Sequence, residues 1–188
     1  MTEISFTSGI QAVTQKAFGE AAVKIGSKNS VNYPWTINES IKAPAAYTKG
    51  ICDCTMMGLT DGKDILMLHL TPMNESNHHF FSITQYIAQK MDLKNPDLQG
   101  ILVGSKPTKR SQDIYNKFLE FFKKYSIPFS ELKIGKDRID VAYSSQTDSW
   151  LVASPKIDRL MKKGADSKTA LEGCFNEVKI APQDEIIK

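Results

Sequence analysis

A turn sequence between two apolar segments constrains the fold of this chain more strongly than any other feature. Thr60-Asp61-Gly62-Lys63 separates an apolar, β-branched segment at residues 45–59 from a second one at residues 64–71. Glycine accepts the positive φ that a tight turn requires, so an Asp-Gly pair at this place predicts a β-hairpin. We therefore expect neighbouring antiparallel strands on the two sides of the turn.

Helix and strand patterns alternate along the rest of the chain. Apolar residues at helical spacing predict four helices, at residues 8–25, 80–91, 111–125 and 157–163, with Ser111 as the candidate cap of the third. Short apolar and β-branched runs predict further strands at residues 99–104, 130–134, 138–144 and 149–153. Residues 27–44 fit an irregular arm, and the tail from residue 155 is largely polar after its helix. This order of elements predicts one mixed α+β domain with additions at both ends.

Composition and charge argue against several classes of protein. With 188 residues, 41% of them hydrophobic and 24% charged, the chain has the size and composition of one globular domain. The 24 basic and 21 acidic residues give a net charge of +3 and are dispersed, whereas nucleic-acid-binding domains usually gather basic residues on one face. No segment approaches the ~20 apolar residues of a membrane helix. We therefore expect neither nucleic-acid binding nor membrane insertion, and the sequence leaves the oligomeric state open.

Cysteine usage and the N-terminal sequence bear on location. The three cysteines, at positions 52, 54 and 174, are few and odd in number, which predicts free thiols in a reducing compartment. The first ten residues lack the basic region followed by an apolar one that marks a Sec-type signal peptide. The expected location is the cytoplasm, or the outside of the cell after export by a route without such a signal.

Cys52 and His69 form the candidate catalytic pair. The predicted hairpin would bring them to a similar height on neighbouring strands. A cysteine attacks as its thiolate, and a nearby imidazole can take the proton and later deliver it to a leaving amine. This chemistry suits the hydrolysis of an amide. Buried cysteines and strand histidines are more commonly packing residues, so the spacing alone is a weak signal.

The segment around this pair resembles the CheD-type chemoreceptor glutamine deamidases, whose site is shared with the catalytic domain of the cytotoxic necrotizing factor toxins. In that family a Gly-x-Cys sequence opens a strand, and the catalytic histidine comes from the next strand, shortly before a proline. This chain has Gly50-Ile51-Cys52, then His69 seventeen positions after Cys52, and then Pro72. The resemblance spans residues 45–153 and follows the order of the helices and strands.

The resemblance implies both a fold and an activity. The fold would be a Cys-His deamidase-like sandwich of mostly antiparallel sheets layered with two or three helices. The core at residues 45–153 would share a single domain, residues 1–188, with an N-terminal helix and arm at 1–44 and an extension at 154–188. The activity would be conversion of glutamine to glutamate on a protein substrate, a bacterial receptor or a host signalling protein, through a thioester and without a cofactor or metal ion.

One feature of that family is missing at its expected position. The deamidases carry a threonine six positions before the cysteine, where it supports the histidine, and this position is Ala46 here. Thr48 is the nearest threonine, and a shift in strand register would let its hydroxyl take that role. Thr71, Asn77 and His78 are the other candidates for the group that orients the histidine.

Several alternatives stay open. Cys54 competes with Cys52 for the role of nucleophile, because alternate residues of a regular strand share a face. The two cysteines and the histidines at 69, 78 and 79 include zinc-type ligands, although Cys-x-Cys on a strand is poorly spaced for a tetrahedral site. Ala46 fits an inactive protein-binding module, and a peptide substrate would make the chain a cysteine peptidase. The basic group at residues 106–110 could meet an anion before a helix, although a solvated loop is the commoner role of such a group.

Overall fold

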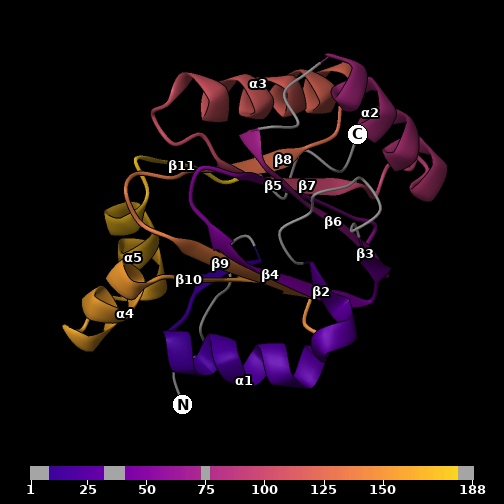
Figure 1. The fold of residues 1–188 in the computed structure, drawn as a ribbon. Helices are drawn as coiled ribbons and strands as arrows, with labels where there is room; N and C mark the ends of the chain where they lie inside the picture. The colour runs from indigo at the N-terminus through magenta and orange to yellow at the C-terminus, as the bar shows by residue number, and fades with distance from the viewer. Residues whose placement is uncertain (1–8, 32–40, 73–76, 182–188) are drawn as a thin grey trace.

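The computed structural model describes residues 9–31, 41–72 and 77–181 and shows two β-sheets facing one another, with helices outside them (Figure 1). The first sheet runs in the order β1 (Ile10–Ala12), β10 (Ser149–Ala153), β9 (Ile139–Ser144), β4 (Ala45–Ile51) and β2 (Ser30–Val31). The second runs in the order β11 (Glu177–Lys179), β8 (Phe129–Lys133), β7 (Gln99–Gly104), β5 (Thr55–Thr60), β6 (Ile65–Leu70) and β3 (Ile41–Ala43). Six of the nine pairs of described strands are antiparallel. The predicted α+β class is confirmed.

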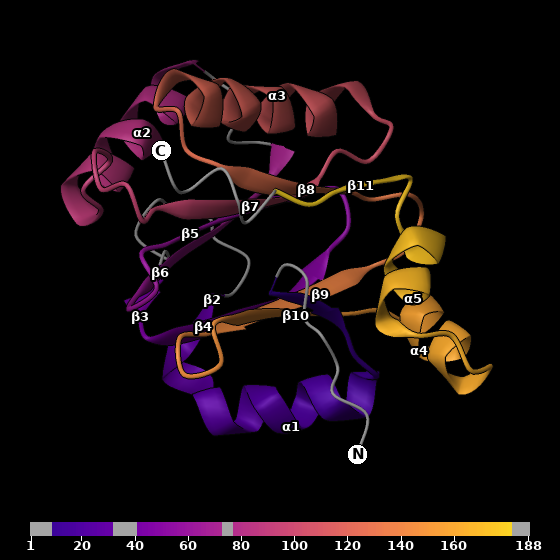
Figure 2. The same cartoon turned by 180° about the vertical axis from the view of Figure 1, so that it is seen from behind.

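Helices cover the outer faces of both sheets (Figures 1 and 2). The helix α1 (Gln15–Ile25) packs on the first sheet and is followed by the short helix η1 (Ser27–Asn29), while α2 (Asn77–Lys90) and α3 (Lys109–Lys124) cover the second sheet. The helices α4 (Pro155–Lys162) and α5 (Ser167–Cys174) lie together at one end of the sandwich. None of the described helices is long and apolar enough to cross a bilayer.

The layer between the sheets holds an apolar cluster, here called the inter-sheet core, to which both sheets contribute. On β5, Met56 faces this core and Met57 faces the cluster beneath α2 and α3. All residues of β5 and β6 are buried. Because the second sheet is covered on both faces, these central strands are mainly apolar instead of alternating with polar residues, with His69 as a buried exception on β6.

The predicted hairpin is confirmed. The strands β5 and β6 pair antiparallel along their whole length, with His69 opposite Met56. Gly62 in the turn has a φ of 80°. The Asp61 carboxylate accepts hydrogen bonds from two backbone N–H groups that follow it in the turn. Turn chemistry therefore fixes the register that places His69.

The strand expected at residues 45–59 is instead two strands in different sheets. The strand β4 pairs with β9 in the first sheet, whereas β5 pairs with β6 and β7 in the second, and residues 52–54 form a bend between them. The register shifts between Thr48 and Ile51, where Gly50 has a φ of 79°. The sequence does not reveal this crossing, because both sheets bury the same apolar residue types. Cys52 consequently lies outside the strands, immediately after β4.

The two ends of the chain take part in the sheets. The strands β1 and β2 pair in parallel with β10 and β4, and β11 extends the second sheet. Cys174 belongs to the C-terminal tail, whose sequence is largely polar. It is nevertheless buried at the end of α5, with its Sγ 3.2 Å from Ser154 Oγ. The helix α1 begins at Gln15 because β1 precedes it, and α3 is capped by Thr108, with Ser111 inside its first turn. Strands of two or three residues carry too little alternation for the sequence to predict them.

Gly58 of β5 lies where the two sheets approach closely. A Cβ at this position would be 2.2 Å from Cη2 of Trp150, on β10 of the opposite sheet. We expect Gly58→Ala to lower the free energy of unfolding by about 1–3 kcal/mol in urea denaturation, because the indole must move within a packed core. Gly19→Ala in α1 is the control, since a Cβ there meets nothing within 4 Å and alanine favours a helix. An equal loss in both variants would contradict this role of Gly58.

Candidate active site

Two buried polar side chains from different sheets meet in the layer between them. Thr48 on β4 is 0% exposed and His69 on β6 is 1% exposed. The hydroxyl oxygen of Thr48 lies 2.7 Å from Nδ1 of His69. The two residues are far apart in the chain and in different sheets, so only the folded sandwich brings them together.

The hydroxyl of Thr48 determines which nitrogen of His69 carries the hydrogen. Thr48 Oγ1 donates a hydrogen bond to the carbonyl oxygen of Val31 on β2, at 2.7 Å. A hydroxyl has a single hydrogen, so Thr48 must accept the hydrogen bond from Nδ1–H of the ring. The neutral ring therefore has its lone pair on Nε2, and this nitrogen is the one that can take a proton.

His69 is neutral at physiological pH. Its burial lowers its pKa from the ordinary value of 6.5 to about 4, because apolar surroundings disfavour the imidazolium form. A neutral imidazole with a fixed tautomer is ready to act as a base, and no protonated fraction has to be discharged first.

Cys54 lies in the bend before β5, and its side chain points into the inter-sheet core. Met56 is directly opposite His69, and directly opposite residues share a face. Cys54 precedes Met56 by two positions, and both side chains belong to the inter-sheet core. Cys54 and the Thr48–His69 pair therefore both lie in the layer between the two sheets.

The Cys54 thiol is protonated at rest. Burial, and then the charges of Asp53 and Cys52, raise its pKa to about 11. Both Cys54 and His69 are consequently neutral near pH 7, since the same apolar layer opposes thiolate and imidazolium alike.

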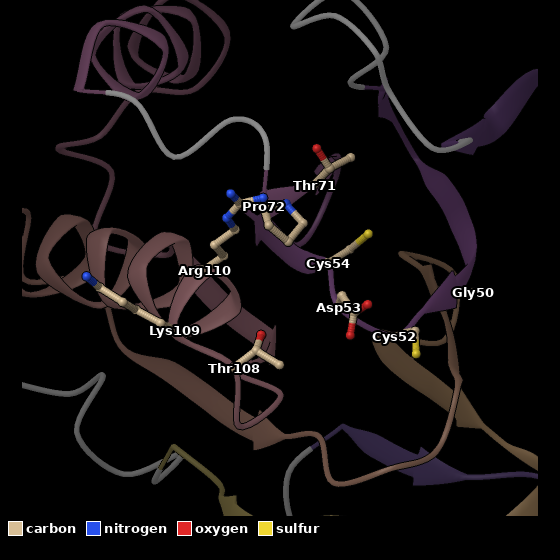
Figure 3. Close-up of a pocket in the computed structure, with 9 residues that line it drawn as sticks. All are labelled: Gly50, Cys52, Asp53, Cys54, Thr71, Pro72, Thr108, Lys109 and Arg110. Atoms are coloured by element: carbon tan, nitrogen blue, oxygen red, sulfur yellow. The ribbon is translucent and has the colours of Figure 1, made fainter.

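Cys52 has a different environment in the bend. It is half-buried, and its Sγ lies 3.7 Å from Nζ of Lys106, which follows β7. The same ammonium pairs with Asp53 at 2.6 Å, and the Gly50 N–H donates to Oδ1 of Asp140 on β9 at 2.8 Å. These contacts attach the bend to both sheets. Figure 3 shows the two sulfurs of the bend pointing in different directions.

An open cleft of about 480 Å³ adjoins the bend (Figure 3). Its lining comes from the bend, the residues after β6 and the start of α3, and comprises Gly50, Cys52, Asp53, Cys54, Thr71, Pro72, Thr108, Lys109 and Arg110. The volume falls in the range of pockets that bind small ligands, so it can admit a substrate side chain. Both cysteines border this cleft.

The residues singled out in the sequence are partly assembled by the fold. Thr48 contacts His69, as expected if a register shift makes it the substitute for the family's threonine. Ala46, at the expected threonine position, is fully buried and has no polar group for the ring. Cys52 borders the cleft from outside the strands, and its role as the nucleophile stays a prediction.

The other candidates for orienting His69 are less informative. Thr71 borders the cleft, and the side chains of Asn77 and His78 lie outside the described ones. Sequence reasoning did not find the Val31 carbonyl, because a backbone acceptor leaves no mark on residue type. It also gave no specific role to Lys106, although the basic group at 106–110 pointed to this loop.

Metal-ligating side chains do not cluster in the part of the chain that is described. No group of three or more His, Cys, Asp or Glu residues there is placed to hold a metal ion, and this statement does not extend to the side chains at positions 78 and 79. Cys52, Cys54 and Cys174 are free thiols, as their number predicted.

Comparison with protein-family models gives no match, and comparison with curated proteins gives none either. The geometry of the site therefore carries the functional interpretation.

Replacing the Thr48 hydroxyl tests the buried hydrogen-bond chain. We expect Thr48→Val to destabilise the fold by about 1–3 kcal/mol, because the Val31 carbonyl and the His69 Nδ1–H both lose their bond to it inside the core. Thr48→Ser keeps the hydroxyl and should lose less stability. Urea denaturation of the two variants measures the difference, and a greater loss in the serine variant would contradict the hydrogen-bond account.

The low pKa of His69 makes stability depend on pH. The pKa of His69 is about 4 in the folded protein and 6.5 in the unfolded chain. The neutral histidine therefore contributes fully to the stability of the fold above pH 6.5, and this contribution is lost as pH falls toward 4. Between pH 7 and pH 4.5, the wild type should lose about 2 kcal/mol more stability than His69→Gln. Urea unfolding of both proteins at both pH values measures this difference. The carboxylates are the same in the two proteins, so their effect on the pH dependence of stability largely cancels in the comparison. Identical pH dependence would contradict a buried neutral histidine.

Proposed function

We propose that this chain is a cysteine-dependent protein-glutamine deamidase, with His69 as the base, Thr48 as its orienting residue and Cys54 as the nucleophile. The observation that carries the proposal is the 2.7 Å contact between Thr48 Oγ1 and His69 Nδ1. A Cys-His site for amide hydrolysis needs one ring nitrogen held by a third group, so that the other can exchange protons with the sulfur. The adjoining cleft gives a substrate amide access to the cysteines.

The choice of cysteine depends on which spacing of the deamidase pattern is kept. Cys52 precedes His69 by seventeen positions, which is the spacing that the resemblance to the CheD-type enzymes rests on. Cys54 follows Thr48 by six positions, which is the threonine-to-cysteine spacing of the same family. We favour Cys54, because Thr48 is the threonine in contact with His69 and because the Cys54 side chain lies in the same layer between the sheets. Cys52 is the alternative nucleophile at the same cleft.

The neutral resting state of both groups shapes the mechanism. His69 Nε2 takes the thiol proton as the sulfur attacks the carboxamide carbon of a substrate glutamine, so no thiolate has to persist in the buried layer. The tetrahedral intermediate collapses to a thioester, and ammonia leaves with the proton from the imidazolium. Water then attacks the thioester with Nε2 as base, which releases glutamate and restores the thiol.

The resemblance supplies the substrate class, a bacterial receptor or a host signalling protein, and with it a location in the bacterial cytoplasm or, for an exported effector, in a host cell. The inactive binding module was suggested by the alanine at position 46. The Thr48–His69 contact weighs against it, because the hydroxyl that such a module would lack is present.

Single substitutions separate the two cysteines. We expect the wild type to convert glutamine to glutamate in proteins of a bacterial or human cell lysate, detected by mass spectrometry of digested samples. Cys54→Ala should reduce this conversion by at least about a hundredfold, because the attacking atom is lost. Cys52→Ala should keep most of it. Thr48→Val should lose activity and Thr48→Ser should recover a large part, because only the serine keeps the hydroxyl.

The opposite outcomes have distinct meanings. Full activity in Cys54→Ala with none in Cys52→Ala would move the nucleophile to Cys52. Cleaved chains in place of converted glutamines would identify a peptidase. Absence of conversion in both lysates, combined with equal iodoacetamide labelling of Cys54 in the wild type and His69→Gln, would refute the proposal.

A further inference from the structure

Arg110 presents a positive charge at the cleft. It lies in the first turn of α3, is exposed and lines the cleft. Figure 3 shows its guanidinium group directed toward Pro72, near the bend that carries the cysteines. Among the residues that the structure describes, no carboxylate forms an ion pair with it.

The carboxylates nearest the bend already have partners. Asp53 pairs with the Lys106 ammonium at 2.6 Å. Asp140 accepts the Gly50 N–H at 2.8 Å and lies 3.9 Å from the Arg138 guanidinium. These two carboxylates are thus compensated within the fold, whereas the charge of Arg110 has no carboxylate partner among the side chains that the structure describes. A carboxylate that enters from outside would meet a net attraction there.

The side chain that carries this charge is suited to a carboxylate. A guanidinium group has a planar set of N–H donors that matches the two oxygens of a carboxylate, and such paired hydrogen bonds fix orientation as well as add affinity. Arg110 and Cys54 line the same cleft, so a carboxylate on Arg110 and a carboxamide at Cys54 would belong to one short segment of substrate.

On the basis of the deamidase function proposed above, we propose that Arg110 is a specificity residue that binds a substrate carboxylate, so that the target glutamine lies in an acidic segment of its protein. Arg110 takes no part in bond making. It positions the segment whose carboxamide reaches the sulfur.

Lys109 provides a matched comparison. It has the same charge, is the preceding residue of α3 and also borders the cleft. Figure 3 shows its ammonium group extending away from the bend, while the Arg110 guanidinium is directed toward Pro72. A general effect of positive charge would depend on both residues equally, whereas a specific carboxylate contact depends on Arg110.

The test measures binding separately from catalysis. Three fluorescein-labelled peptides of equal length carry a central glutamine flanked by glutamate, by serine or by lysine. Fluorescence anisotropy gives their affinities for Cys54→Ser, which lacks the proposed nucleophile, and for the same protein with Arg110→Gln, Arg110→Lys or Lys109→Gln added.

We expect the glutamate-flanked peptide to bind Cys54→Ser about tenfold more tightly than the serine-flanked one, and the lysine-flanked one most weakly. Arg110→Gln should abolish this preference, Arg110→Lys should keep part of it, and Lys109→Gln should leave most of it. Circular dichroism of each variant checks that the fold is retained.

The role of Arg110 would be overturned if the acidic and neutral peptides bound equally or not at all. An equal loss of the preference for the acidic peptide in Arg110→Gln and Lys109→Gln would overturn it as well. The result does not depend on activity. Charge-selective binding by a protein that never converts glutamine would keep the carboxylate site and reject the deamidase. Conversion of glutamines without any preference for acidic neighbours would keep the deamidase and reject the carboxylate site.

Discussion

The hydrogen bond between Thr48 and His69 crosses the layer through which the two sheets pack. Its surroundings are apolar, and a polar group that loses its partner in such surroundings is costly. The bond also needs Val31 of β2 as acceptor for the threonine hydrogen, so it depends on the N-terminal arm as well as on β4 and β6. A relative shift of the sheets would break it. The position of the imidazole is therefore a property of the whole sandwich.

Burial gives this site a particular form of reactivity. In many Cys-His sites the thiolate is stabilised in advance by a neighbouring cation, and the sulfur is then also open to oxidation. Here the layer raises the pKa of Cys54 and lowers that of His69, so that both are neutral until a substrate engages them. A protected thiol of this kind reacts only when an electrophile is held against it. In the proposed deamidase, selectivity then depends on the groups of the cleft that position the substrate.

The sequence predicted much of the fold and a smaller part of the site. The hairpin at Gly62 was predictable because a tight turn has a specific chemical requirement. The crossing at residues 52–54 was not, because both sheets bury the same residue types on either side of it. Thr48 emerged only as a substitute for Ala46, because the register of β4 shifts between Thr48 and Ile51, on the way to the cysteines. Residue spacing along the chain cannot show such a shift.

The bend connects the stability of the fold to the chemistry of the cleft. The end of β4 before it is held by the Gly50–Asp140 hydrogen bond to β9, and its middle by the Asp53–Lys106 pair to the loop after β7 of the second sheet. A side chain at Gly50 would contact Arg138 at 3.2 Å with a φ of 79°, so the bend requires glycine at this point. Cys54 lies where the bend enters β5, and its position relative to His69 is set by how the bend spans the two sheets. The sulfur proposed as the nucleophile thus takes its place from the same packing that orients the imidazole.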